Sequence, residues 1–590
     1  MNQPEKFYHS QIEKYQSHLK NASRKLGLSS LMRLFVFLAI AFSIYYFWGN
    51  LQLLIPSALV GIVIFVILIS RHTDLKYERD KFRELIRLNN LELQVLHGEF
   101  HHLASGKEFD TPQHPFSQDI DLFGKGSFFQ YLNRSALSQG QRKLADILGS
   151  NDTEKILQKQ ESIRELAEKA DWRQRFSAIA GLIKTQTDSE GVLSWFQGYK
   201  RFVPGFMKWL PWIFSFFSIV AIVAFFTENI SGMQLLLWFF LGLGITGIYL
   251  KRINQLSMGV SRVQETFHQY HQLLNLIEGT SFNSEILKQK KGLIWQEKEK
   301  SSAIIKKFSK AIDALDQRNN MIFGVLGNGF LLWDLRQSFK LEIWIKSHGH
   351  KVRDWFEVIE FIDAYNSLGN FAFNHPHYGF PSLEKHTPVL KAKDLAHPLL
   401  NPVKRVANDM DIGSEEFFII TGANMAGKST FLRTVSLAIV MANTGLPVCA
   451  SKCIYRPIKL ISSMRTTDSL TDDESYFFSE LKRLKFIVDA IQKETYFIIL
   501  DEILKGTNST DKAIGSKKFL QKLVASRSTG IIATHDLSLC DVATELDQVK
   551  NFYFDAEIKN DELYFDYKFK KGICQNMNAS FLLKKMQIVD

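Results

Sequence analysis

The sequence predicts a C-terminal α/β domain built on a phosphate-binding loop, preceded by a mainly α-helical region with four transmembrane helices in two hairpins. Three observations support this fold class. A glycine-rich loop lies between an apolar run and a helix-forming run near residue 425. Two long stretches in the N-terminal half are almost free of charge. The segments around them are rich in Leu, Lys, Glu and Gln at helical spacing.

The composition agrees with a protein of several domains. The chain has 590 residues and a formal net charge of +11, which suits contact with nucleic acid or with an anionic membrane surface. Its four cysteines are too few and too scattered for a disulfide framework, so a reducing compartment is expected.

The strongest motif is the segment Thr421–Thr430, which fits the phosphate-loop pattern G-x-x-x-x-G-K-[ST]. The apolar run 416–420 predicts a strand before it, and the run 431–439 predicts a helix after it. Backbone N–H groups of such a loop surround phosphate oxygens at the positive end of a helix. The predicted phosphate-binding residues are Gly422, Asn424, Met425, Ala426, Gly427, Lys428, Ser429 and Thr430.

Further motifs of an ATPase follow in order. The segment 496–502 is a buried-strand pattern that ends in two carboxylates. Asp501 and the Ser429 hydroxyl are predicted to hold Mg²⁺, and Glu502 to polarise the attacking water. A second buried strand, 531–535, ends in His535, which can sense the γ-phosphate. ATP and Mg²⁺ are therefore the expected substrate and cofactor.

The charge-free stretch 34–70 predicts the first transmembrane hairpin. As one helix it would be about 55 Å long at 1.5 Å per residue, whereas a hydrocarbon core is about 30 Å thick. Two spans joined by a turn at Trp48-Gly-Asn50 fit better. Trp48 and the neighbouring tyrosines would lie at the interface as aromatic anchors.

The stretch 209–250 predicts a second hairpin, interrupted by Glu228 in its turn. Lysines and arginines flank the outer ends of both hairpins, and neither turn carries a basic residue. The positive-inside rule therefore places both termini and all long segments in the cytoplasm, with the protein in the cell inner membrane. The alternative is a buried core helix pair in a soluble protein.

The predicted domains follow from these segments. They are a cytoplasmic N-terminal helix (1–33), a transmembrane hairpin (34–70), a cytoplasmic helical core (71–208), a second transmembrane hairpin (209–250), a region of extended helices (251–385) and the α/β domain (386–590). Within the core, the segment 153–170 predicts an amphipathic helix whose apolar stripe includes Leu157, Ile163 and Leu166.

Three segments together resemble the ATPase of the MutS mismatch-repair family: Thr421–Thr430, Asp501–Asp511 and Ala533–Asp536. MutS ATPases belong to the ABC class, so the resemblance implies an ABC-type ATPase with a conformational cycle. It is specific over about 390–550, where His397–Leu400, Ala407–Met410 and Gly445–Ala450 also match. The segment Gly126–Arg142 resembles the start of the MutS helical core, and the region 251–385 would hold its lever helices.

The resemblance also implies a homodimer. In MutS dimers the stretch that matches Ser475–Glu480 reaches the partner's nucleotide, which gives Ser475 that role here. The family usually has a small residue, a glycine and a basic residue before this serine, whereas this chain has Asp472-Asp-Glu474. Three carboxylates near a γ-phosphate would repel it unless Mg²⁺ or a lysine intervenes. Leu504-Lys505 also stands where the family has Gly-Arg.

The expected function is that of a membrane-anchored MutS-like ATPase that binds DNA. Two alternatives remain open: an ATP-switched membrane scaffold that does not bind DNA, and an ABC-transporter-type ATPase. The transporter is disfavoured because the chain lacks the Leu-Ser-Gly-Gly-Gln signature and has only four short spans.

Two further patterns bear on DNA. MutS recognises mismatches with a Phe-x-Glu wedge, and Phe82-Arg-Glu84 has that pattern, but it lies in a charged helical run, which indicates a chance match. No domain that could carry the wedge fits before residue 110 once the first hairpin is removed, so a variant that lacks the mismatch-recognition domain is expected. No strong preference for mismatched DNA is therefore expected. The lysine cluster in 288–310 could contact a phosphate backbone or could be a solvated helix face beside Glu297 and Glu299.

Overall fold

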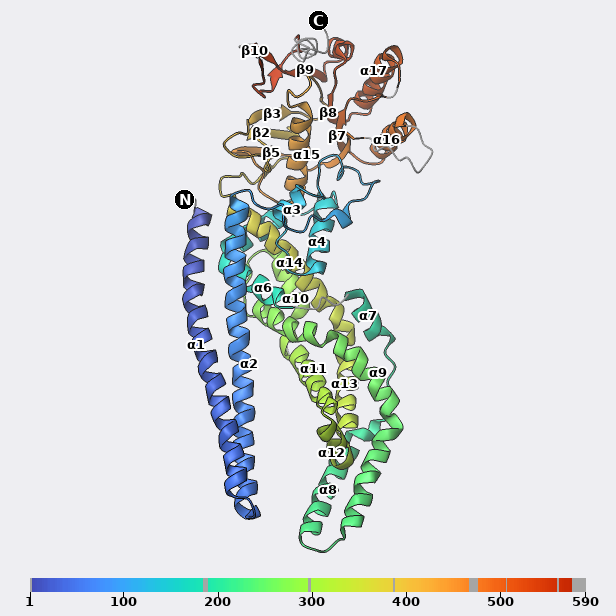
Figure 1. The fold of residues 1–590 in the computed structure, drawn as a ribbon. Coiled ribbons are helices and arrows are strands. Elements are labelled where there is room, and N and C mark those ends of the chain that lie inside the picture. The colour runs from blue at the N-terminus through green and yellow to red at the C-terminus, as the bar shows by residue number, and fades with distance from the viewer. Residues whose placement is uncertain are drawn as a thin grey trace.

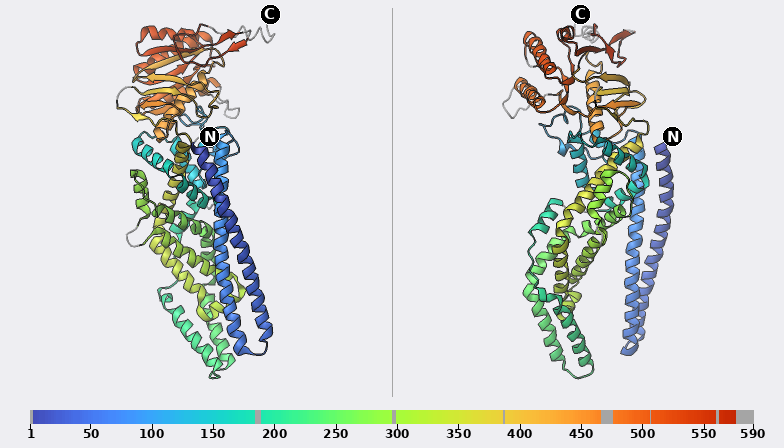
Figure 2. Two further views of the ribbon diagram at one scale, coloured as in Figure 1. Left: turned by 90° about the vertical axis from the view of Figure 1, so that its left-hand side faces the viewer. Right: turned by 180° about the vertical axis from the view of Figure 1, so that it is seen from behind.

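The chain folds into an elongated molecule with the α/β domain at one end and two helical hairpins at the other (Figures 1 and 2). The computed structural model describes residues 3–183, 189–295, 299–385, 388–465, 476–505, 507–559 and 562–575. The helices of the N-terminal region are α1 (Gln3–Tyr46), α2 (Leu51–Leu96), α3 (Phe128–Leu132), α4 (Ser138–Gly149), α5 (Ile156–Glu168), α6 (Ala170–Gly181), α7 (Ser189–Gly198), α8 (Leu210–Phe226), α9 (Gly232–Glu278), α10 (Glu285–Ile294), α11 (Ser301–Asp316), α12 (Met321–Leu331), α13 (Trp333–His348) and α14 (Val352–Asn374).

The first predicted hairpin consists of α1 and α2, joined by a turn at 47–50, where the sequence predicted it. Large apolar side chains of this hairpin are exposed, for example Phe35 (73%) and Ile67 (61%). Each helix continues without a break from the apolar stretch into polar sequence, so the predicted boundaries at 33/34 and 70/71 are not structural breaks. The polar half of α1 returns to the core, where the Tyr15 hydroxyl donates to Asp171 at 2.8 Å.

The second hairpin consists of α8 and α9, and length and apolar composition support the prediction of four spans for three of the four helices. Within the described part of the chain, three helical segments are long and apolar enough to cross a membrane, namely Gln3–Tyr46, Pro56–Leu96 and Gly232–Ser261. The fourth candidate, α8, has only 17 residues, because the chain before it forms a 3₁₀ turn at Gly205–Lys208. An additional short apolar helix, α12, lies inside the region predicted as levers.

The helical core is organised around α14, which is buried along most of its length. The Asp363 carboxylate on α14 accepts hydrogen bonds from the backbone N–H groups of Ala136 (3.2 Å) and Leu137 (2.9 Å), so it fixes the start of α4. The amphipathic helix predicted at 153–170 is α5, with Ile163 buried against this core. Leu157 is 56% exposed, so its assignment to the apolar stripe was wrong.

The Phe-x-Glu tripeptide takes part in contacts within and between helices. Phe82 of α2 stacks on the rings of Tyr15 and His18 of α1, with centroids 6.2 and 5.3 Å apart. Glu84 forms an ion pair with Arg87 one turn later. The Phe82 side chain therefore belongs to the packing of the first hairpin, in agreement with a chance match.

Among the described residues, the α/β domain contains a six-stranded sheet, a four-stranded sheet, a two-stranded sheet of β10 and β11, and the helices that cover them (Figure 1). The six-stranded sheet has the order β12-β9-β4-β8-β7-β6, in which all neighbours are parallel except β12 and β9. The four-stranded sheet has the order β1-β5-β2-β3. The elements are β1 (Ser382–Leu383), β2 (Leu390–Leu395), β3 (Asn408–Ile412), β4 (Phe417–Gly422), α15 (Lys428–Thr444), β5 (Lys452–Tyr455), β6 (Lys459–Ser463), α16 (Tyr476–Ile491), β7 (Tyr496–Asp501), α17 (Ser509–Ala525), β8 (Thr529–Ala533), α18 (Val542–Glu545), β9 (Val549–Phe554), β10 (Glu557–Lys559), β11 (Glu562–Tyr564) and β12 (Lys570–Lys571).

A loop between α2 and α3 joins the α/β domain to the helical core. Asp119 in this loop accepts a hydrogen bond from the Ser462 hydroxyl at 2.6 Å and another from the backbone N–H of Arg465 at 2.8 Å. Asp121 forms ion pairs with Arg433 (2.9 Å) and Arg465 (2.6 Å). These carboxylates bind the end of β6 and the helix after the phosphate loop, so the site and the core are in direct contact.

Candidate functional site

The phosphate loop connects β4 to α15, as the sequence predicted. Gly427 has φ of +101°, a conformation that glycine adopts without strain. A Cβ at Gly422 would lie 2.6 Å from the carbonyl oxygen of Phe554, so the neighbouring strand leaves no room for a side chain. Of the other predicted loop residues, Ala426 is fully buried, whereas Asn424, Met425 and Thr430 are exposed at the mouth of the loop.

Lys428 is buried, with 6% of its surface exposed, and its ammonium group lies inside the loop. It donates hydrogen bonds to the carbonyl oxygens of Gly422 (2.8 Å) and Ala423 (3.1 Å). Burial lowers the pKa of Lys428, and the carboxylates of Asp501 and Glu502 oppose that shift. The ammonium group is therefore held by weak neutral acceptors, which a phosphate oxygen can replace.

Ser429 and Asp501 meet at the carboxyl edge of the sheet. The Ser429 hydroxyl donates to Asp501 Oδ2 at 2.7 Å. Burial raises the pKa of Asp501, and the hydrogen bond from Ser429 opposes that rise. A hydroxyl and a half-buried carboxylate in contact are oxygen ligands of the kind that Mg²⁺ prefers, so the two residues fit the predicted metal site.

Glu502 and His535 also meet, although they follow different strands. His535 Nε2 lies 2.9 Å from Glu502 Oε1, and Lys505 Nζ lies 3.7 Å from the other carboxylate oxygen. The hydrogen bond from His535 is the main cause that lowers the pKa of Glu502 to about 2, with Lys505 contributing. Glu502 is therefore ionised at neutral pH and can accept a proton or orient a water molecule.

The same nitrogen of His535 also lies 3.1 Å from Lys428 Nζ. One ring nitrogen cannot accept from Lys428 and donate to Glu502 at the same time. We assign the hydrogen bond to Glu502, because a bond to an ionised acceptor is the stronger of the two. His535 thus touches both the phosphate-loop lysine and the predicted base.

Glu480 of α16 is a site residue to which the sequence assigned no role. It is 3% exposed, and its two carboxylate oxygens accept from the backbone N–H groups of Leu504 (2.6 Å) and Lys505 (3.0 Å). Glu502 and Leu504 have positive φ, +50° and +59°, so this turn needs external support. Glu480 therefore positions the turn that carries Glu502.

A cavity of about 590 Å³ opens beside the phosphate loop and is the candidate pocket for the nucleoside. Tyr567 covers one side, since a Cβ at Gly427 would lie 3.1 Å from its ring. The guanidinium of Arg405, on another wall, donates to the Tyr378 hydroxyl at 3.1 Å. The sequence did not point to Tyr567 or Arg405, because they lie outside the motifs and reach the loop only through the fold.

Ser475, predicted to contact the partner's nucleotide, lies outside the described residues, as do Asp472, Asp473 and Glu474. The description resumes at Tyr476, the first residue of α16. The placement of the predicted contact is therefore an expectation from the resemblance alone.

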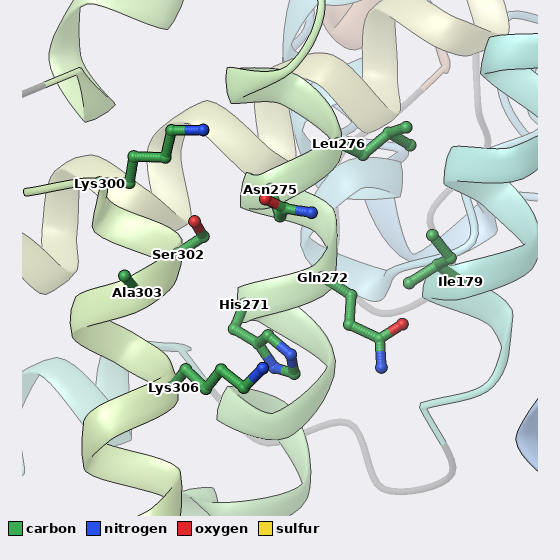
Figure 3. A pocket seen from close by; sticks show the side chains of 9 residues that line it. All are labelled: Ile179, His271, Gln272, Asn275, Leu276, Lys300, Ser302, Ala303 and Lys306. Atoms are coloured by element: carbon green, nitrogen blue, oxygen red, sulfur yellow. The ribbon is translucent and has the colours of Figure 1, made fainter. Parts of the chain in front are cut away.

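The lysine cluster at 288–310 has mixed surroundings, and Lys288 and Lys310 are exposed. Lys290 pairs with Glu357 at 2.5 Å, Lys291 donates to the carbonyl oxygen of Thr280, and Lys307 pairs with Glu299. The contacts of these three lysines agree with the interpretation of the cluster as a structural or solvated helix face. Lys306 instead lines a cavity of about 440 Å³ with Lys300 and His271, as Figure 3 shows. No acidic side chain lines this cavity among the described residues, so it suits an anion.

Residues 418–586 match the family model for MutS domain V. The human MutS protein homolog 4 is 31% identical over 204 residues, which cover 32% of this chain and 22% of that protein. The DNA mismatch repair protein MutS of Methanococcoides burtonii is 30% identical over 237 residues, 39% of this chain and 26% of its own length. The corresponding protein of Caldanaerobacter subterraneus is 32% identical over 248 residues, 40% and 27% of the two chains.

The chain thus spans between 22% and 27% of the length of these relatives. The similarities lie in the part of the chain that contains the phosphate loop.

The contacts of Glu480 generate a prediction. In Glu480→Ala the turn at 502–505 loses two hydrogen bonds, so Glu502 is no longer held in place. We expect ATP affinity to stay within about threefold, while turnover falls by about tenfold, the effect of roughly 1.4 kcal/mol on the barrier. Nucleotide titration and steady-state hydrolysis measure the two quantities. Glu494→Ala, at an exposed ion pair with Lys459, is the matched control; equal turnover in both variants would exclude the positioning role.

Proposed function

We propose that this chain is a membrane-anchored ATPase of the MutS family, from the similarity of its C-terminal domain to MutS domain V. It binds ATP with Mg²⁺ and hydrolyses ATP to drive a conformational cycle of a dimer. One observation carries the proposal: Lys428, Ser429, Asp501, Glu502 and His535 come from three separate segments and meet at one edge of a parallel sheet.

The arrangement supports each part of the chemistry. Lys428 offers a positive charge to the phosphates, and the loop N–H groups at the start of α15 add to it. Ser429 and Asp501 would hold Mg²⁺, which neutralises phosphate charge when bound. Glu502, ionised and held by His535, is in the state that a general base requires.

The exposed apolar surface supports membrane anchoring in the cell inner membrane. Apolar side chains such as Tyr45 (81%) and Phe226 (79%) are exposed on both hairpins, far beyond what a water-soluble surface carries. Both hairpins point away from the α/β domain, so one bilayer can receive them (Figure 2). A lipid bilayer is therefore the proposed partner of α1, α2, α8 and α9.

The proposed assembly is a homodimer in which Ser475 contacts the partner's nucleotide. Its support is the resemblance to MutS dimers and the position of α16, which follows this serine and holds the Glu502 turn through Glu480. A contact made just before α16 would therefore change the position of Glu502, the proposed general base.

The chemistry predicts the behaviour of Glu502→Gln. The amide keeps the shape but cannot accept a proton, so ATP binding should persist while turnover falls by about 100-fold or more. Lys428→Ala should instead lose ATP binding. Filter binding and phosphate release measure the two effects. Glu545→Gln, at an exposed ion pair with Lys517, controls for loss of a surface charge. Parental turnover in Glu502→Gln would refute the assignment of the base.

The topology can be tested with single cysteines on a chain whose four native cysteines are all buried. Trp48→Cys and Asn229→Cys lie at the two hairpin turns, and Ser347→Cys is an exposed position of α13. An impermeant maleimide applied to intact cells should label the two turn positions and should reach position 347 only after permeabilisation. Labelling of position 347 in intact cells would overturn the proposed orientation.

DNA is the proposed second partner, supported by the MutS relatives and by the cavity of Lys300, Lys306 and His271 (Figure 3). We expect the double substitution Lys300→Ala, Lys306→Ala to weaken duplex binding and to reduce the slope of log affinity against log salt by about 2. Lys307→Ala, which removes a charge already paired with Glu299, should change neither. If the parental protein shows no DNA affinity at low salt, the ATP-switched scaffold without DNA becomes the better account.

A further inference from the structure

The short helix α12 has an unusual distribution of side chains. It has 11 residues, and its buried positions are the small or polar Gly327, Asn328 and Gly329. Its exposed positions are large and apolar: Met321 is 82% exposed, Ile322 72%, Leu326 50% and Val325 45%. These four lie on one face at helical spacing. This is the reverse of a helix in a water-soluble protein, whose apolar face is turned inward.

The position of α12 explains this reversal. A Cβ at Gly242 of α9 would lie 2.2 Å from the carbonyl oxygen of Gly329, so the two backbones are in close contact. The rings of Phe239 and Phe330 are 5.2 Å apart beside this contact. Gly242 lies about 15 Å along α9 from Gly232, half of a hydrocarbon core of about 30 Å. The C-terminal part of α12 therefore lies beside the middle of the apolar stretch of the second hairpin.

Polar contacts anchor the other end of α12 at the inner edge of that stretch. Arg318, just before α12, donates to Asn254 of α9 at 2.7 Å and lies 3.1 Å from a carboxylate oxygen of Asp334, just after it. The Arg336 guanidinium lies 3.8 Å from the ring centroid of Trp212, near the start of α8. Charged and aromatic groups of this kind mark the level of a membrane interface.

We propose that α12 is inserted into the cytoplasmic leaflet, with Met321, Ile322, Val325 and Leu326 against lipid acyl chains. The proposal rests on the membrane anchoring proposed above and adds a lipid-contacting element that the sequence did not indicate. At 1.5 Å per residue, α12 is about 16 Å long and too short to cross. The chain enters from α11 and leaves through α13, and both of these helices extend toward the α/β domain (Figure 1). The insertion therefore leaves the cytoplasmic orientation unchanged.

Lipid acyl chains are favoured over a protein partner because the exposed face of α12 is continuous with other exposed apolar surface. The exposed face of α12 adjoins the exposed apolar surface of α8 and α9, against which α12 packs, so one lipid environment covers all three helices. Insertion of α12 would attach the end of the α11–α13 pair to the bilayer, because α12 connects these two helices. The same pair leads through α14 to the core contact at Asp363, so the membrane and the nucleotide domain act on one connected set of helices.

The test is depth-dependent fluorescence quenching on the full chain in vesicles of phosphatidylcholine and phosphatidylglycerol. Bimane is attached to single cysteines that replace Ile322 or Val325. Leu241→Cys, on the exposed face of α9, reports the second hairpin itself, and Ser347→Cys, an exposed position of α13, reports water. Lipids with a doxyl group at carbon 5 are the membrane quencher, and iodide is the aqueous quencher.

We expect lipid quenching at 322 and 325 close to that at 241 and at least about twofold above that at 347, with little quenching by iodide. Iodide quenching at 322 and 325, with lipid quenching at 241, would overturn the insertion of α12 and leave the anchoring intact. Quenching of 322 and 325 by neither reagent would overturn it in favour of a protein partner. Iodide quenching at 241 as well would refute the membrane anchoring itself.

Discussion

The candidate nucleotide site depends on the parallel pairing of β8 with both β4 and β7. In this register Ala533 lies opposite Ile420 on one side and Asp501 on the other, so the three strands end at one level. Parallel strands have their carboxyl ends at the same edge, and loops that follow them can meet there. The phosphate loop, the Asp501-Glu502 pair and His535 come together for this reason. Asp119 and Asp121 then connect the same edge to the helical core.

The sequence predicts the phosphate-loop region of the fold well, because the residues that form the pattern are close together in the sequence. An apolar run, a glycine-rich loop and a helix-forming run follow one another between 416 and 439, and the structure has β4, the loop and α15 there. Tyr567 and Glu480 could not be found in this way. Each acts on a segment far away in the sequence, through the ring that covers Gly427 and through the hydrogen bonds to Leu504 and Lys505. Only the fold brings such partners together.

The two apolar hairpins show a different limit of sequence reasoning. Charge flanks located the apolar stretches, but they also suggested boundaries where α1, α2 and α9 are continuous helices. Backbone hydrogen bonds continue through a change of side-chain polarity, so composition alone does not mark a helix end. The glycines and Asn328 of α12 lower the apolar signal of that segment. Its exposed apolar face becomes visible only when the contact of Gly329 with Gly242 shows which side is buried.

The continuity of α2 has a mechanical consequence. Leu85 is buried with Tyr15 in a small cluster near the core, whereas Leu51, where α2 begins, lies about 50 Å away along the helix. A rigid rod that turns by 10° about the buried end moves its far end sideways by roughly 9 Å, about the diameter of one helix. A sub-ångström repacking near α6 and α14 would be almost undetectable in the core, and yet it would displace the turn at 47–50 by about the diameter of a helix. Because α2 is long, a small rotation at its buried end thus becomes a large lateral displacement at the turn of the hairpin.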